Sequence, residues 1–190
     1  RFAQNSSLSL GDMINEGAQD SLVLASGGVA RDFLSIFRRS VDVARERGGG
    51  ARGERINVED VNVAAGEYDG SKREEFRHDT FDDDQRELNE EYAEIQKFCL
   101  DRVQSNCILV NVNASSSKVQ LKDELVDLKL LHLVDSRVTV SKRKGKIYAA
   151  YMLDLSQYTG ERTRRGFEII PFWKPGSTES LRRTTLIYIE

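Results

Sequence analysis

Apolar residues at helical spacing alternate with glycine-rich breaks in the front third of the chain. A first helix is predicted over residues 12–25, where four apolar positions recur at near-helical spacing: Ile14, Ala18, Leu22 and Ala25. Gly27 and Gly28 follow this stretch, as glycine commonly does just past a helix end. A second helix is predicted over residues 29–47. Its buried face is expected to be made by Phe33, Phe37, Val41 and Ala44 and broadened by Leu34 and Ile36.

A third helix is expected after the glycine-rich segment 48–53, which predicts a surface loop. Asn57 can cap a short helix, with Asp60 three residues further on in a variant of the capping box. The apolar residues expected to face inward are Val58, Val61 and Ala65. Three helices in this order predict a compact bundle, which we assign to residues 1–70.

The next segment, 71–106, is rich in charge and is expected to form a connecting helix. Asp82, Asp83 and Asp84 are adjacent rather than spaced at every second position, so they do not form a calcium loop. Acids at this place favour the positive end of a helix dipole. The helix that follows carries a stripe of apolar residues: Leu88, Tyr92, Ile95, Cys99 and Val103.

The pattern changes in residues 107–190. A short strand is predicted over 107–113, a serine-capped helix over 120–131 with Leu121, Leu125 and Leu128 inward, and a β-hairpin over 136–154. The turn of that hairpin reads Lys-Arg-Lys-Gly-Lys. Helix, helix and a hairpin with a basic tip are the layout of a winged helix. Residues 166–173 predict a further strand and 174–183 a loop. The expected fold is therefore mainly α with a small β component.

Composition favours a globular chain. Hydrophobic residues make up 39% and charged residues 31% of the chain, and no apolar run reaches the roughly 20 residues needed to span a bilayer. The two cysteines, Cys99 and Cys107, match neither a disulfide framework nor a metal motif, which favours a cytoplasmic protein without a membrane segment. The start lacks a methionine and a signal-peptide pattern, which indicates a fragment. The net charge of −3 combines −8 in residues 1–110 with +5 in residues 111–190.

Catalytic motifs are missing from the sequence. No segment matches the phosphate-binding Gly-x-x-x-x-Gly-Lys-Ser/Thr loop. Residues 131–135 look like half of a Walker B strand but lack the following acid, so we interpret them as structural. His78 and His132 have no neighbours that would make a nucleophile relay or a metal site. This chain is not expected to be a complete catalyst, and no metal site is predicted in it.

Two stretches resemble a known family. Residues 25–44, "ASGGVARDFLSIFRRSVDVA", followed by "INVEDVNVAAGEY", are similar to the helical lid of AAA+ ATPases, particularly the replication-initiator branch. In that family a Gly-x-Ala-Arg segment opens an apolar helix, and a winged-helix domain follows the lid. The match carries over to Gly28, Ala30 and Arg31, while the common acidic residue before the alanine is Val29 here.

The resemblance implies a role for Arg31. It corresponds to the sensor-2 arginine, which reaches the terminal phosphates of the nucleotide; a planar guanidinium near a helix N-terminus suits that role. The alternative is a surface arginine paired with Asp32 or with an acid of the first helix. The resemblance also implies that ATP and Mg²⁺ are bound mainly by an upstream P-loop domain.

The hairpin tip is the candidate DNA contact. Its four cations can each neutralise a backbone phosphate of double-stranded DNA: Lys142, Arg143, Lys144 and Lys146. The preceding helix is expected to expose mostly acids, which a major groove repels, on a face made of Lys122, Asp123, Glu124, Asp127 and Lys129. DNA contact is therefore expected through the tip, with little sequence specificity.

Three functional interpretations remain open. The first is the lid and winged-helix part of an initiator-like AAA+ ATPase that contacts DNA, a partner protein or another copy of itself. The second is a signalling ATPase of the STAND type, in which the same parts regulate assembly without DNA. The third is a free-standing winged-helix regulator with a helical dimerisation domain.

Overall fold

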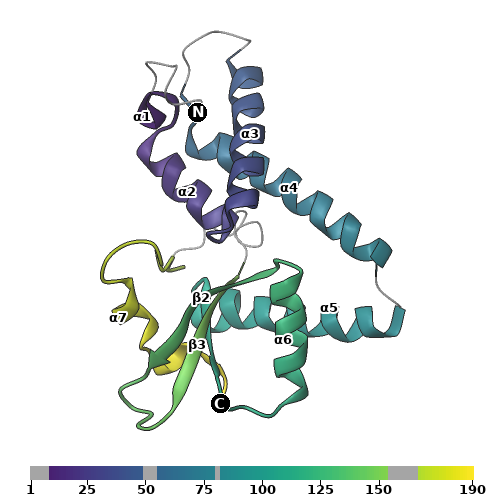
Figure 1. Cartoon of the computed structure of the whole chain (residues 1–190), viewed down its shortest axis with the longest axis vertical. Helices are drawn as coiled ribbons and strands as arrows, with labels where there is room; N and C mark the ends of the chain where they lie inside the picture. Colours follow the sequence, from purple (N-terminus) through teal and green to yellow (C-terminus); the bar gives the residue numbers. More distant parts are fainter. Residues whose placement is uncertain (1–8, 49–54, 80–81, 154–166) are drawn as a thin grey trace. The chain divides into compact units, whose positions relative to one another are not determined.

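The computed structural model describes residues 9–48, 55–79, 82–153 and 167–190. They form mainly helices, together with a four-stranded mixed sheet (Figure 1). The chain divides into two compact units, residues 1–74 and 75–190. The second unit thus begins inside the segment expected to be a connector.

Two adjoining helices form where one was predicted in the first unit. α1 spans Leu10–Met13 and α2 spans Glu16–Ser26. The break lies at Ile14, which forms a parallel bridge with Ile56, so the backbone there bonds to another segment instead of continuing a helix. The four expected core positions are nevertheless buried: Ile14, Ala18, Leu22 and Ala25. Gly27 ends α2 in the left-handed conformation, as predicted.

α3 spans Ala30–Arg47 and packs against α2, and Gly48 follows as its C-cap. Ile36 and Ala44 of the predicted face are buried, whereas Leu34 is 65% exposed and the other two buried positions are Asp32 and Ser40. Phe33 and Phe37 lie beside this stripe, half-buried and stacked with ring centroids 6.5 Å apart. Ser40 is tolerated inside because its hydroxyl donates to the carbonyl oxygen of Ile36 at 2.8 Å. The predicted loop at 48–53 lies, beyond Gly48, outside the described residues.

α4 spans Val58–Asp79, so it is a long helix instead of the short one predicted. Its capping box is confirmed: the backbone N–H of Asp60 donates to Asn57 Oδ1 at 3.0 Å, and the backbone N–H of Asn57 donates to Asp60 Oδ2 at 2.8 Å. Val61 and Ala65 are buried as expected. Val58 is not, because 37% of it is exposed.

The second unit begins its described part with α5, Asp82–Lys97, which continues as the π-helix η2, Phe98–Val103. The aspartates at 82–84 therefore open a helix, as the dipole argument predicts. Four of the five predicted stripe positions are buried: Leu88, Tyr92, Ile95 and Cys99. α6 spans Ser117–Asp127 and packs on α5; Ser116 caps it, its hydroxyl accepting from the N–H of Lys118 at 3.3 Å.

The sheet has the strand order β2-β3-β1-β4. β1 is Cys107–Asn111, β2 is Leu131–Thr139 and β3 is Ile147–Leu153. β2 and β3 form the predicted hairpin, and the half-Walker-B stretch 131–135 is the first part of β2, in agreement with its structural interpretation. β1 and β3 are almost wholly buried, as expected for central strands covered on both faces.

The last part of the chain differs from its prediction. No strand forms in residues 167–173, where only Glu168 makes an isolated bridge with Ser105. The expected loop 174–183 contains a short helix, α7, Ser177–Leu181. After a single 3-10 turn, η4, Thr184–Leu186, the strand β4, Ile187–Ile189, runs parallel to β1. Neither α7 nor β4 was predicted.

Candidate functional site

Arg31 lies in the first turn of α3, where the resemblance places it. Its side chain is 77% exposed, and its Nε lies 3.4 Å from Asp32 Oδ1. The pairing with Asp32 that was the alternative to a phosphate role is therefore present, but it is long and exposed on the arginine side. Such a contact leaves most of the guanidinium donors available to an anion.

Asp32 is fully buried directly behind Arg31. The hydroxyl of Tyr68, on α4, donates to Asp32 Oδ1 at 2.9 Å. A buried carboxylate with a hydrogen-bond donor fixes the first turn of α3 against α4. The turn that carries Arg31 is thus anchored, while the arginine side chain remains at the surface.

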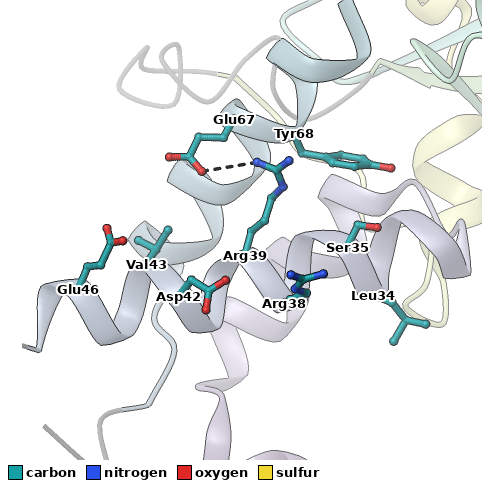
Figure 2. Close-up of a pocket in the computed structure, with 9 residues that line it drawn as sticks. All are labelled: Leu34, Ser35, Arg38, Arg39, Asp42, Val43, Glu46, Glu67 and Tyr68. Carbon is teal, nitrogen blue, oxygen red and sulfur yellow. Dashed lines mark ion pairs between the residues drawn. The ribbon is translucent and has the colours of Figure 1, made fainter. Parts of the chain in front are cut away.

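A groove of about 620 Å³ runs between α3 and α4 in the first unit (Figure 2). Figure 2 shows Arg39 pointing from α3 toward α4, where its guanidinium lies 3.8 Å from Glu67 and 5.9 Å from the ring centroid of Tyr68. The lining carries both signs of charge: Arg38 and Arg39 against Asp42, Glu46 and Glu67. This balance of charge suits neither a bare anion nor a bare cation, and no local pattern in the sequence predicts the groove.

The basic tip joins β2 to β3 through a tight turn. The backbone N–H of Arg143 donates to the carbonyl of Val140 at 2.9 Å, and that of Lys146 donates to the carbonyl of Arg143 at 3.2 Å. Gly145 has a φ of 80°, which a residue with a side chain rarely adopts. The turn brings the four predicted cations together at one exposed end of the hairpin. Among the described residues, Lys142 and Lys144 make no ion pair.

Two residues that the sequence analysis missed lie at the same tip. Arg182, which follows α7, lines a groove of about 370 Å³ together with Arg143, Lys144 and Lys146. Glu190 pairs with two of these cations: its Oε1 is 2.5 Å from Lys146 Nζ and 3.3 Å from Arg143 Nε. No local pattern reveals either neighbour, because both reach the tip through the unpredicted elements α7 and β4.

A polar cluster fixes the position of β4. The hydroxyl of Tyr188, on β4, donates to Glu91 Oε1 on α5 at 2.8 Å. Lys118 of α6 places its Nζ 3.3 Å from the other oxygen of Glu91. Burial, reinforced by the bond to Glu91, raises the pKa of Tyr188, so this hydroxyl stays protonated and remains a donor. β4 is therefore attached to both helices, which places Glu190 at the tip.

α6 does not present the face expected of it. Lys122, predicted to be exposed, is 4% exposed, and its Nζ donates to the hydroxyl of Tyr151 on β3 at 2.9 Å. An amphipathic lysine can bury its stem and still find a polar partner, which explains the difference. The acids Asp123, Glu124 and Asp127 are exposed as predicted. Lys122 also forms an ion pair with Asp123, so the charge of that acid is compensated, and Glu124 and Asp127 are the other exposed acids of this face.

The predicted histidines have different outcomes. His132 is buried on β2, with 4% of it exposed. His78 lies among the residues whose side chains the structure does not describe.

No protein-family model, curated protein or solved structure matches this chain. Within the described residues, none of the helices combines the length and apolarity that crossing a membrane requires.

Proposed function

We propose that this chain is the lid and winged-helix part of an AAA+ ATPase, in which Arg31 senses the nucleotide and the hairpin tip binds the backbone of double-stranded DNA. The observation that supports it best is the exposed tip, where Lys142, Arg143, Lys144 and Lys146 gather at one tight turn. Lysine and arginine at a protruding turn suit phosphate oxygens without reading bases, so the binding is weakly sequence-specific.

The acidic surface of α6 supports contact through the tip alone. Asp123, Glu124 and Asp127 are exposed there, and a helix with these side chains is repelled by the phosphates that flank a major groove. The hairpin β2-β3 and its pairing with β1 support the winged-helix part of the proposal, whereas a single helix, α6, lies between β1 and β2 in place of the two of a helix-turn-helix.

The nucleotide part of the proposal rests on Arg31. Its exposed side chain and anchored helix turn suit an arginine that contacts a phosphate held by another domain. ATP and Mg²⁺ belong to the upstream P-loop domain, and this chain contributes one positive charge to their site.

Titration of duplex DNA against the chain at several low salt concentrations tests the DNA part. We expect measurable binding that weakens steeply with salt and is lost in the double variant Lys142→Glu with Lys144→Glu. The matched control is Arg86→Glu with Lys97→Glu, which makes the same charge change on α5, away from the tip. Absence of binding at low salt, or equal losses in both variants, would contradict DNA binding through the tip.

The second candidate is the STAND-type module, in which this unit contacts protein. The exposed acids of α6 favour it, because they form a surface suited to a basic partner protein instead of a polyanion. A chain that binds no DNA but binds its own P-loop domain, and loses that binding when Asp123 and Asp127 become lysine, would support this candidate.

A further inference from the structure

Glu190 occupies the basic tip in the structure. Its side-chain carboxylate lies between Lys146 Nζ, at 2.5 Å, and Arg143 Nε, at 3.3 Å, while Oε2 is 3.5 Å from the hydroxyl of Tyr148. One carboxylate therefore meets three donors, two from the turn and one from the start of β3. Phosphate oxygens recognise the same donors, because lysine and arginine bind carboxylate and phosphate with similar geometry.

Arg143 and Lys146, the two cations that Glu190 contacts, also line a groove beside the tip, and Glu190 is not part of the lining of this groove. The groove beside the tip is lined by Arg143, Lys144, Lys146 and Arg182, and only Arg182 comes from outside the hairpin. Arg182 is 46% exposed and is bonded to Glu179 at 3.3 Å, an exposed pair of the kind that contributes little. Four cations thus line a groove of about 370 Å³, which is large enough to admit a phosphate group.

We propose that Arg143, Lys146 and Arg182 form a seat for a backbone phosphate, and that the carboxylate of Glu190 holds this seat until DNA displaces it. This inference rests on the proposed binding of duplex DNA to the tip. It adds Arg182 to the DNA-binding residues and makes Glu190 an internal competitor that weakens and regulates binding.

The carboxylate of Glu190 can be held by the cations of the tip and released when DNA binds. The hydrogen bond from Lys146, with the nearby charge of Arg143, holds the pKa of Glu190 below its ordinary value, so it is ionised at neutral pH. Its side chain is 46% exposed, and ion pairs this exposed are weak enough for a strong polyanion to replace them. The hydrogen bond between Tyr188 and Glu91 fixes the position of β4, so Glu190 stays close to the tip after DNA displaces its carboxylate.

Fluorescence anisotropy with a short labelled duplex, over a series of salt concentrations, tests the competitor. We expect Glu190→Gln to bind about threefold more tightly than the unaltered chain, with a similar slope of log affinity against log salt, because both seat the same phosphate. Asp127→Asn is the control, because it removes an exposed acid of the same unit at α6. Equal affinity gains in Glu190→Gln and Asp127→Asn would overturn the competitor role.

The role of Arg182 has its own pair of variants. Arg182→Gln is expected to weaken DNA binding about threefold. Arg86→Gln, which also removes an exposed arginine paired with a glutamate nearby in the sequence, should leave DNA binding unchanged. Equal effects of the two substitutions would remove Arg182 from the seat.

The two proposals fail in different ways. If the unaltered chain and Glu190→Gln both fail to bind at low salt, both proposals are wrong. If the chain binds and Lys142→Glu with Lys144→Glu abolishes binding, but Glu190→Gln changes nothing, the tip binds DNA and the competitor role is wrong. NMR of the Glu190 carboxyl carbon gives a second readout: DNA should raise the pKa of Glu190 toward its ordinary value, and an unchanged pKa in the complex contradicts displacement.

Discussion

Arg47, the last residue of α3, forms two hydrogen bonds with Asp60, in the first turn of α4. Its Nε and Nη2 donate to the two carboxylate oxygens at 2.8 and 3.0 Å. Asp60 is 1% exposed and also accepts the N–H of Asn57. One buried carboxylate thus joins the end of one helix to the start of the next.

Asp60→Ala should therefore destabilise the first unit by about 2–3 kcal/mol, since it removes both the pair and the cap. Arg47→Ala should cost less, about 1–2 kcal/mol, because Asn57 still satisfies part of the carboxylate. Urea unfolding measures both. Glu59→Ala, an exposed acid of the same turn, is the control, and a loss there equal to that of Asp60→Ala would contradict the argument.

The same carboxylate makes the stability of the first unit depend on pH. Burial alone would raise the pKa of Asp60, but the hydrogen bonds from Arg47 and Asn57 outweigh it and hold the pKa below the ordinary value. The stabilisation is then fully present above the unfolded pKa of about 3.9 and is lost as the pH falls through the lower folded pKa. The free energies of unfolding of the unaltered chain and of Asp60→Asn should converge as the pH falls from about 6 to about 2, a range of about two units either side of that value. Parallel profiles of the two proteins would contradict this.

Lys122 and Tyr151 form the corresponding buried contact of the second unit. Tyr151→Phe should cost about 1–2 kcal/mol, because it removes a hydrogen bond from a buried ammonium group. Lys122→Met keeps the packing of the stem without the charge, so it should be tolerated better than Lys122→Ala. Chemical denaturation measures the free energies of unfolding of these three variants and so ranks them. Lys122→Met should also leave DNA binding unchanged, and a loss of binding would show that this lysine reaches the ligand.

Arg31 should behave as a residue that contributes little to folding. Arg31→Ala should change the free energy of unfolding by less than about 0.5 kcal/mol, because the contact to Asp32 is long and the side chain is exposed. In the protein that includes the P-loop domain, the same substitution should weaken ATP binding or turnover. Arg45→Ala, another exposed arginine of α3, is the control. Unaltered nucleotide binding in Arg31→Ala would refute the sensor role.

The two thiols should be inert in the folded chain. Cys99 and Cys107 are both fully buried, and burial raises the pKa of Cys99 to about 12 and that of Cys107 further. A thiol reagent at neutral pH should therefore modify both only after unfolding, at the same urea concentration as the loss of helix signal. Fast labelling of the native chain would contradict the buried positions.

Local patterns account for what the sequence predicted well. The capping box of Asn57 and Asp60 needs residues only three positions apart, and the basic turn between β2 and β3 is a short-range signal. The prediction that the stripe from Leu88 to Cys99 is buried was correct for the same reason: apolar residues recur at helical spacing on one face of the helix.

Long-range contacts account for what it missed. The buried stripe of α3 contains Asp32 and Ser40, which apolar periodicity rejects and which only Tyr68 and a backbone carbonyl make acceptable. β4 has only three residues and becomes a strand because it pairs with β1, which lies much earlier in the sequence of the unit. Arg182 and Glu190 could not be assigned to the tip before α7 and β4 were known.

The parallel pairing of β4 with β1 has a consequence for synthesis. Ile187 pairs with Leu109, so during translation β1 can pair with β3, one strand of the β2-β3 hairpin, long before residues 187–189 exist. Until then one edge of a strongly apolar strand is open to another nascent chain. A chaperone that covers β1 would therefore act in the interval between the completion of β3 and the arrival of β4.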